Sequence, residues 1–271
     1  MLGIEKSDGA TQLSNEATCG LGELRIRHPS GTFPVTPASL VALRAIGAHP
    51  QLLSGIGIDW GSGSGVLSIA VARIKAVTRV YGLDIVPDNV EIARENARTN
   101  GVEQKTEFLH SDSFLPFDQT DRKAVASLKR SVQFVLANPP SSHGDDGFGF
   151  RRRVLREAPE FLSRGGVVLL SISTQYGGQR IKSLADDAPG FDHGGVFATT
   201  DWVPFDLKRP DLLECLKNYV NEERRGGLEY EFVFPGDQWH VFFNAQAALA
   251  HYELTGESPL SKWQTHLFTC N

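Results

Sequence analysis

The segment of this 271-residue chain best suited to chemistry is Asp59–Gly65, which reads Asp-Trp-Gly-Ser-Gly-Ser-Gly. It follows a short apolar run, Ile56–Asp59, and precedes an apolar run with helical spacing, Leu67–Ala76. Glycines at a turn between a strand and a helix permit left-handed backbone and let a ligand approach the main chain closely. An ordinary flexible turn is the alternative, because glycine is the default turn residue.

An acidic residue ends the next expected strand, Arg79–Ile85. Asp84 lies 19 residues after Gly65, and a carboxylate in that place can accept both hydroxyls of a ribose. Capping of the following helix is the alternative role, but Asp88 can do that and leaves Asp84 free. Together the two features favour a nucleoside ligand. A dinucleotide is disfavoured because Val66 stands at the third small position of Gly-x-Gly-x-x-Gly/Ala.

Polar side chains also follow the third and fourth expected strands, Glu107–Leu109 and Gln133–Ala137. The third is followed by Ser111-Asp112-Ser113, where a carboxylate or hydroxyl could reach an adenine amino group; a solvated strand end is the alternative. The fourth is followed by Asn138-Pro139-Pro140-Ser141. The two prolines stiffen the chain and fix the direction of Asn138 and its carbonyl. An amide there lies at the carboxyl end of a central strand, where doubly wound sheets bind ligands.

Strands and helices alternate along the chain and would position these residues. Further strands are expected at Val167–Ile172, Leu228–Phe234 and Thr265–Cys270, and helices near residues 37–48, 88–100, 152–162, 210–224 and 243–255. Continuous apolar strands between helices are typical of a parallel sheet that is covered on both faces. The sequence therefore predicts an α/β fold with a doubly wound, mostly parallel seven-stranded sheet whose last strands could be antiparallel.

Two regions fall outside this alternation. Residues 1–50 are expected to form an N-terminal extension with a short hairpin and a helix, and roughly the first twenty of them are interpreted as a flexible lead-in. Residues 51–271 are then the main domain. Within it, residues 186–211 combine Asp, Gly and Pro with scattered aromatic residues. They are interpreted as a late insertion, a long loop of the kind from which substrate lids are built.

The composition excludes several classes of protein. A net charge of −5 with 22% charged residues is typical of a globular protein and unlike the basic footprint of a general nucleic-acid binder. No apolar run approaches the ~18 residues of a membrane span, and no secretory signal is recognisable. Cys19, Cys215 and Cys270 form no Cys-x-x-Cys pair, so neither disulfides nor a bound metal are expected. We expect a cytoplasmic protein, and the oligomeric state is left open.

The ordered motifs resemble those of the class I, Rossmann-like S-adenosylmethionine-dependent methyltransferases. The resemblance rests on Asp59–Gly65, Asp84, Asp112 and Asn138-Pro139-Pro140. The Asn-Pro-Pro element is similar to that of the branch that methylates exocyclic amines of bases or side-chain amides. Gly31–Pro37 resembles the segment before the first motif in the methyltransferase small domain group, which includes ribosomal-RNA guanine and release-factor glutamine methyltransferases. The resemblance covers roughly residues 24–180 and implies S-adenosylmethionine as the cofactor.

The resemblance also implies roles for individual residues. The cofactor would be bound by Asp59, Gly61, Gly63, Gly65, Asp84, Ile85, Asp112, Ser113 and Asn138. Within this set, Asp59 would anchor the methionine amino group, Asp84 the ribose hydroxyls and Asp112 the adenine amine. The catalytic pair would be Asn138 and Pro139, whose side-chain and main-chain oxygens would accept hydrogen bonds from the amine that is methylated.

One position departs from the family pattern. Ser141 stands where an aromatic residue usually follows the two prolines and stacks on a planar substrate. A ring from elsewhere would then stack on the acceptor, or the acceptor is a small-molecule amine. Rings that could do so belong to Phe148, Phe150, Tyr176 and Trp202. The residues expected to contact the substrate are Phe33, Pro140, Ser141, His143, Tyr176 and Trp202.

Two smaller signals have plain alternatives. His143 could serve as an acid or base, although a histidine in a glycine-rich loop is more often simply solvated. The run Arg151-Arg152-Arg153, with Arg156, could meet phosphate but is more often the solvated start of a helix.

The predicted function is methyl transfer from S-adenosylmethionine to the nitrogen of an amide, a nucleobase amine or a small-molecule amine. The lone pair of such a nitrogen is often delocalised, and two acceptors on its hydrogens would free it for attack. Positioning and electrostatics would carry most of the rate acceleration. The alternatives are a small-molecule O-methyltransferase and a catalytically inactive S-adenosylmethionine-binding partner subunit. RNA, protein and small molecules all stay open as the acceptor.

Overall fold

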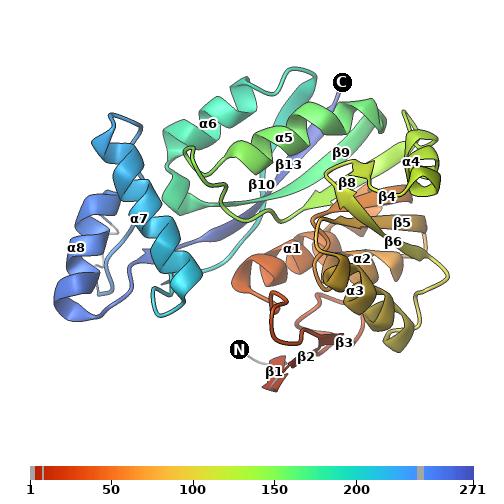
Figure 1. Cartoon of the computed structure of the whole chain (residues 1–271), viewed down its shortest axis with the longest axis horizontal. Helices are drawn as coiled ribbons and strands as arrows, with labels where there is room; N and C mark the ends of the chain where they lie inside the picture. Colours follow the sequence, from red (N-terminus) through yellow and green to blue (C-terminus); the bar gives the residue numbers. More distant parts are fainter. Residues whose placement is uncertain (1–3, 8, 237–240) are drawn as a thin grey trace.

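The computed structural model describes residues 4–7, 9–236 and 241–271 and builds them around one twisted sheet (Figure 1). From edge to edge the strands are β10 (Phe191–Thr199), β13 (Trp263–Cys270), β9 (Leu162–Ser173), β8 (Val132–Ala137), β4 (Gly55–Trp60), β5 (Val77–Asp84), β6 (Thr106–Asp112) and the two-residue β7 (Leu115–Pro116). The pairs between β9 and β6 are parallel. β13 is antiparallel to both of its neighbours. The predicted fold class is therefore confirmed, with an antiparallel strand at the late edge.

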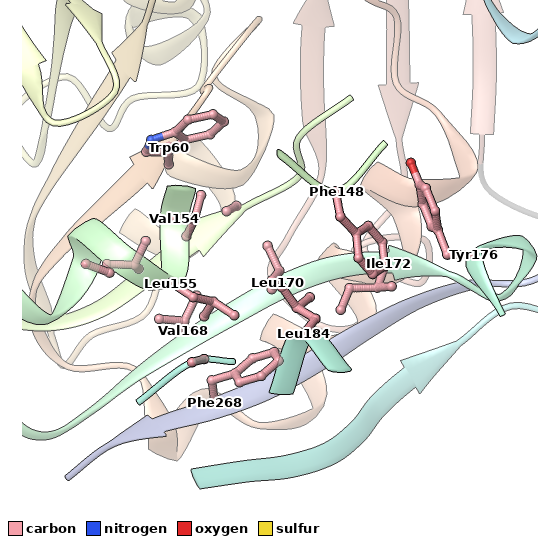
Figure 2. Packing of buried hydrophobic residues seen from close by; sticks show 14 of the residues in the cluster. Trp60, Phe148, Val154, Leu155, Val168, Leu170, Ile172, Tyr176, Leu184 and Phe268 are labelled. Atoms are coloured by element: carbon pink, nitrogen blue, oxygen red, sulfur yellow. The ribbon is translucent and has the colours of Figure 1, made fainter. Parts of the chain in front are cut away.

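Helices cover both faces of this sheet. On one face lie α1 (Pro37–Ala48), α2 (Val66–Ala72) and α3 (Pro87–Thr99), and on the other α4 (Gln119–Ala126), α5 (Gly149–Glu157) and α6 (Gly178–Asp186). Each face has its own cluster of buried apolar side chains. In Figure 2, Val154 and Leu155 of α5 meet Val168 and Leu170 of β9. The carboxyl edge of the sheet is thereby fixed by two separate cores.

The described residues from Ile4 to Arg27 form a small sheet and not the predicted flexible lead-in. β1 (Ile4–Ser7), β2 (Ala10–Leu13) and β3 (Leu24–Arg27) pair antiparallel in this order. Leu13, Leu24 and Ile26 are fully buried and join the core beside α1 and α3. The alternation of Leu24–Arg27 predicts a short strand and β3 confirms it, whereas β1 and β2 were not predicted.

The late part of the chain also departs from the prediction. Residues 191–199, predicted to belong to a loop insertion, form the edge strand β10, whereas the strand predicted at 228–234 contributes only two isolated bridges. β10 contains Gly194 and Gly195 and breaks register near them. An edge strand with one partner tolerates such bulges, which is why its sequence resembles a loop.

The segment that is inserted into the alternation of strands and helices is the β10–β13 connection, residues 200–262, and not residues 186–211. Its described elements are β11 (Val203–Pro204), α7 (Pro210–Arg224), α8 (Ala245–Thr255) and β12 (Leu260–Ser261). α7 and α8 lie beside one another at one end of the molecule, beyond the main sheet (Figure 1). The buried Glu223 carboxylate joins them by accepting from the amides of Ala245 and Gln246 at the start of α8. In the described part of the chain, no helix has the length and apolar character needed to cross a bilayer.

Candidate active site

The glycine-rich turn follows β4 and leads directly into α2. Gly61, Gly63 and Gly65 have φ angles of +68°, +53° and +81°, a conformation that other residues adopt only with strain. A Cβ atom at Gly61 or Gly63 would meet no atom within 4 Å, whereas one at Gly65 would lie 3.0 Å from Ala93 Cβ. The first two glycines therefore leave open space above the main chain, as a bound cofactor requires, and the third allows α3 to pack.

Asp84 ends β5 and reaches across to this turn. Its Oδ2 accepts from the Gly63 amide at 2.7 Å, and its Oδ1 accepts from Val86 N at 2.9 Å and Asn89 Nδ2 at 3.0 Å. The prediction that Asp84 is left free is therefore wrong, because its carboxylate accepts from the backbone of Val86, the N-cap residue of α3, which has no side-chain cap of its own. Two carboxylate oxygens offer about four acceptor positions, so one remains for a ribose hydroxyl.

Asp59 lies beneath the turn with 1% of its surface exposed. Its Oδ2 accepts from the Ser68 amide at 2.9 Å and from Ser68 Oγ at 2.7 Å. Burial raises the pKa of Asp59 to about 7, the nearby Asp84 carboxylate adds to the rise, and the two Ser68 bonds oppose it. A cationic group near this carboxylate would favour its ionised form.

Three further residues predicted to bind the cofactor make different contacts in the structure. Ile85 presents an apolar side chain that is 60% exposed beside Asp84. Asp112 is half-exposed and forms an ion pair with Arg153 at 2.7 Å. The Ser113 hydroxyl instead accepts from Trp60 Nε1 and donates to Glu157, each at 2.6 Å. The structure therefore leaves Ile85 open to a ligand and engages the Ser113 side chain with α5.

Asn138 stands beside the glycine turn because their strands are neighbours. Parallel pairing of β4 with β8 sets Trp60 opposite Ala137, so Gly61 and Asn138 follow at the same edge. Asn138 is half-buried, and its side-chain amide has no hydrogen-bond partner within the described ranges. An amide left unpaired at the mouth of a site can bind a ligand.

Arg151, which the sequence places in a run that is solvated or meets phosphate, instead holds the loop after Asn138. Arg151 is 2% exposed and donates to the carbonyls of Pro139 at 3.1 Å, Pro140 at 3.2 Å, Gly147 at 3.3 Å and Ser171 at 3.0 Å. Among the described residues, no carboxylate lies within ion-pair distance of it. Three of its four carbonyl partners belong to the loop between β8 and α5, so this cation fixes the loop's shape.

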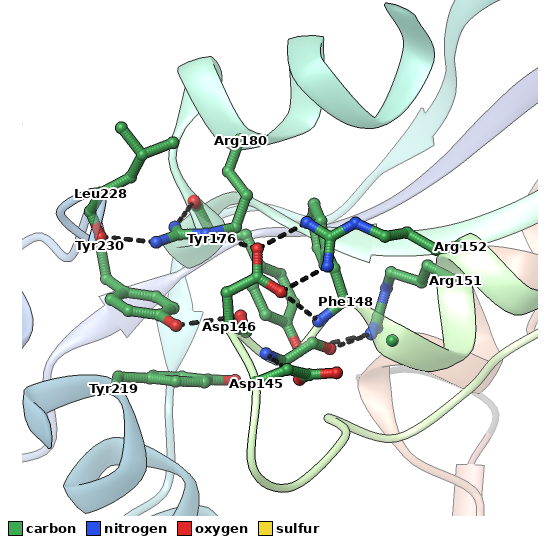
Figure 3. A network of polar contacts seen from close by, with 12 residues as sticks. Asp145, Asp146, Phe148, Arg151, Arg152, Tyr176, Arg180, Tyr219, Leu228 and Tyr230 are labelled. Carbon is green, nitrogen blue, oxygen red and sulfur yellow. Dashed lines mark hydrogen bonds and ion pairs between the residues drawn. The ribbon is translucent and has the colours of Figure 1, made fainter. Parts of the chain in front are cut away.

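The arginine run thus divides into three different environments. Arg152 pairs with Asp146 through two bonds of 2.7 and 2.6 Å, and Arg180 of α6 lies 3.4 Å from the same carboxylate (Figure 3). Arg153 faces Asp112 and Glu157. The reading of a solvated helix start is therefore wrong for Arg151. Its spacing from Val154 and Leu155, three and four positions on, is the signal that placed it on the buried face.

The residues expected to contact the substrate do not gather in one place. Tyr176 is 2% exposed and packs on Phe148 and Tyr219, so its ring is unavailable to a substrate (Figure 2). Trp202 lies over Lys262, with Nζ 4.8 Å from the ring. Pro140 and His143 are exposed, and Asn218 of α7 contacts the His143 ring at 3.4 Å.

Ser141 is covered by α7, which explains its small size. Tyr219 donates to Ser141 Oγ at 3.3 Å. A Cβ on the neighbouring Gly147 would come within 2.6 Å of the same oxygen. An aromatic side chain at position 141 would meet this packing, so the β10–β13 connection occupies the place of the missing ring.

A hollow of about 610 Å³ lies between the segment before α1 and the start of α7. Its lining comprises Gly31–Pro37 with Pro204, Asp206, Arg209, Asp211, Leu212 and Trp263. Phe33, 59% exposed, presents its ring there. Leu212 is two helical turns before Tyr219, so α7 borders both this hollow and the Asn-Pro-Pro loop.

Comparison with known proteins adds to this geometry. The family model described as Ribosomal protein L11 methyltransferase (PrmA) matches residues 29–138, which contain the glycine turn, Asp84 and Asn138. A release factor glutamine methyltransferase of Bacillus anthracis is 31% identical over 177 residues, covering 57% of this chain and 56% of that protein. A Ribosomal protein L11 methyltransferase of Alteromonas mediterranea is 37% identical over 122 residues, covering 42% of this chain and 38% of that protein.

These matches agree with the predicted resemblance to the class I S-adenosylmethionine-dependent methyltransferases, and with S-adenosylmethionine as the cofactor, over the part of the chain that they cover. The chain spans about half the length of the curated release factor glutamine methyltransferases that it matches.

Solved structures support the fold of this chain. The complex of aTrm5 with tRNALeu has a TM-score of 0.53 at 13% identity, covering 98% of this chain and 54% of that one. The YcgJ protein from Bacillus subtilis has a TM-score of 0.51 at 14% identity, covering 84% of this chain and 98% of that one. At these identities the likeness shows a shared fold.

Proposed function

We propose that this methyltransferase transfers a methyl group from S-adenosylmethionine to a nitrogen atom, with Asn138 orienting the acceptor. The observation that carries the proposal is the unpaired Asn138 amide at the end of β8, beside the open glycine turn of β4. Relatives named for methylating a glutamine and a ribosomal protein support nitrogen over oxygen as the target.

The cofactor would lie over Gly61 and Gly63, which leave the space open. Asp84 would accept a hydrogen bond from the ribose, and Ile85 would cover one side of the adenine. The Asp112 carboxylate would accept a hydrogen bond from the adenine amine while it keeps its ion pair with Arg153. The Asp59 carboxylate would attract the ammonium group of the methionine part. When bound, the cofactor supplies an electrophilic methyl group on a sulfonium, and the chain's own task is to present the acceptor to it.

Two oxygens are available to the acceptor nitrogen. The Asn138 amide is unpaired, and the Pro139 carbonyl already accepts from Arg151 at 3.1 Å. A carbonyl has two lone pairs, so Pro139 can accept a second donor. Hydrogen bonds to both oxygens would hold the nitrogen with its lone pair directed at the methyl group.

The acceptor would enter through the hollow beside Phe33. The ring there supplies the stacking surface that Ser141 lacks, and Trp263 lines the same hollow. Its charged lining consists of Asp206 and the pair Arg209–Asp211, joined at 2.6 Å. One carboxylate is thus in excess, which favours a neutral or cationic acceptor over a phosphate. The three free cysteines agree with a cytoplasmic location.

The test is incubation with S-adenosylmethionine that carries a labelled methyl group, together with cell RNA, peptides and small amines in separate reactions. Mass spectrometry then locates the label. We expect a labelled nitrogen, and we expect excess S-adenosylhomocysteine to suppress labelling. Label on oxygen would favour the O-methyltransferase alternative, and absence of label from all acceptors would favour an inactive cofactor-binding subunit.

A further inference from the structure

One buried side chain joins the N-terminal sheet to the glycine turn. Asn96 of α3 is 0% exposed. Its Oδ1 accepts from the Arg27 amide, and its Nδ2 donates to the carbonyls of Arg27 and Ser64, each at 2.9 Å. A single amide therefore completes the pairing of β3 and also holds a carbonyl inside the cofactor turn.

Asn100, one helical turn later, makes the same pair of hydrogen bonds to a residue of β3. Its Oδ1 accepts from the Arg25 amide at 3.0 Å, and its Nδ2 donates to the Arg25 carbonyl at 2.8 Å. Asn96 and Asn100 thus pair with alternate residues of the same strand. Only Asn96 reaches the glycine turn, which makes Asn100 a natural control.

The contact with Ser64 lies where the backbone of the turn is most restricted to glycine conformations. Ser64 lies between Gly63 and Gly65, both with positive φ. Asp84 holds the Gly63 amide from β5, and Asn96 holds the next carbonyl from α3. Two successive residues of the turn are therefore fixed from different sides, and both anchors are buried polar groups whose partners would be costly to leave unpaired.

We propose that Asn96 is a positioning residue for the cofactor, through which the N-terminal sheet sets the shape of the glycine turn. This inference rests on the proposed function, because it takes the turn as the cofactor site. It makes the sheet of β1, β2 and β3 part of the cofactor-binding apparatus, although none of its residues lies in the turn.

The test compares Asn96→Ala with Asn100→Ala by calorimetric titration with S-adenosylhomocysteine. Each variant releases one backbone pair of β3, and only the first frees Ser64. We expect Asn96→Ala to weaken binding about tenfold or more and Asn100→Ala by less than twofold, with thermal unfolding recorded for both. Equal losses of affinity would overturn the proposal, since Asn96 would then only support the fold.

A measurement on the unaltered protein covers the case in which Asn96→Ala does not fold. Coupling is reciprocal, so S-adenosylhomocysteine should slow hydrogen exchange at the Arg27 amide more than at the Arg25 amide. Equal protection of the two amides would contradict the role of Asn96. Failure of the unaltered protein to bind S-adenosylhomocysteine would instead overturn the proposed function and this inference with it.

Discussion

The cofactor side of the sheet, residues 55–112, and the acceptor side, residues 138–153 with the β10–β13 connection, are built differently. On the cofactor side, main-chain groups form most of the candidate site, and the backbone conformation of a short segment such as Asp59–Gly65 follows from its own residues. On the acceptor side, buried side chains from distant segments decide the shape, with Arg151 and Tyr219 foremost. Local geometry can be recognised in a sequence, whereas contacts between distant segments appear only in the fold.

The comparisons with known proteins follow the same division. The matched family model ends at residue 138, where the cofactor side meets the acceptor side. The elements beyond it, from the Arg151 network to α7, are those by which this chain would select its acceptor. Substitutions on the two sides should therefore have different consequences.

The largest effect is expected from Arg151→Met on the acceptor side. Four carbonyls, three of them in buried hydrogen bonds, would lose a charged donor, and an unpaired buried polar group costs about 1–3 kcal/mol. We expect the free energy of unfolding to fall by at least about 3 kcal/mol in denaturant titrations. Arg156→Met is the control, because Arg156 is exposed and contacts only Glu157 at 3.5 Å. Equal stability of the two variants would show that Arg151 does not hold the loop.

His266 of β13 and Asp59 of β4 should make stability depend on pH in opposite directions. Burial, with the charges of His193 and Arg151, lowers the pKa of His266 to about 4, and burial raises that of Asp59 to about 7. Between pH 4 and 6.5 the unfolded chain binds one more proton at His266, so this residue makes stability rise with pH. Over the same range the folded chain binds one more proton at Asp59, so this residue makes stability fall with pH.

These opposing dependences should cancel in the unaltered protein. In Asp59→Asn the contribution of His266 remains, and stability should rise, relative to the unaltered protein, by about 1.4 kcal/mol per pH unit between pH 4 and 6.5. In His266→Gln the difference should have the opposite sign. Denaturant titrations at several pH values measure both slopes. Two variants with parallel pH profiles would refute this assignment.

A smaller effect is expected from Asp84→Ala on the cofactor side. The substitution removes charge-assisted bonds to the turn and the predicted bond to the ribose, each worth about 1.5–3 kcal/mol. S-adenosylhomocysteine should bind about 10- to 100-fold more weakly by calorimetry. Asp88→Ala, an exposed carboxylate four residues later, should leave the affinity unchanged. If both variants bind equally well, Asp84 acts only within the fold.

The smallest effect is expected from Phe33→Ala beside the acceptor hollow. Loss of a stacked ring costs about 0.5–1.5 kcal/mol, so the KM for the acceptor should rise several-fold while S-adenosylhomocysteine affinity is kept. Leu254→Ala, at an 87% exposed position of α8, serves as the control. An unchanged KM in Phe33→Ala would move the acceptor away from this hollow.

The strands and turns of the cofactor side could be predicted from the sequence for a physical reason. Glycine turns, the acid after β5 and the prolines after β8 act through local backbone geometry, which spacing along the chain reveals. Even there, the freedom assigned to Asp84 was wrong, because hydrogen bonds to the start of α3 depend on the fold. The presence of the parallel strands followed from their apolar runs.

The sequence predicted the acceptor side poorly because its decisive contacts join residues far apart. Ser141 contacts Tyr219, 78 positions later, and no local sequence pattern predicts that contact. β10 was not predicted because an edge strand tolerates polar residues and glycines, which are also typical of loops. The burial of Tyr176 likewise depends on Tyr219 and Tyr230, which the β10–β13 connection brings against it.

The central claim is that Asn138 acts on the acceptor and not on the cofactor. Its most direct test is the single-turnover methyl-transfer rate of Asn138→Ala, on the acceptor identified by labelling, together with its affinity for S-adenosylhomocysteine. We predict a loss of about 2.7–4 kcal/mol of transition-state stabilisation, or ~100- to 1000-fold in rate, with nearly unchanged affinity. Asn138→Asp, which keeps one acceptor oxygen, should retain part of the rate. Full turnover in Asn138→Ala would contradict the account and reduce Asn138 to a residue that ends a strand.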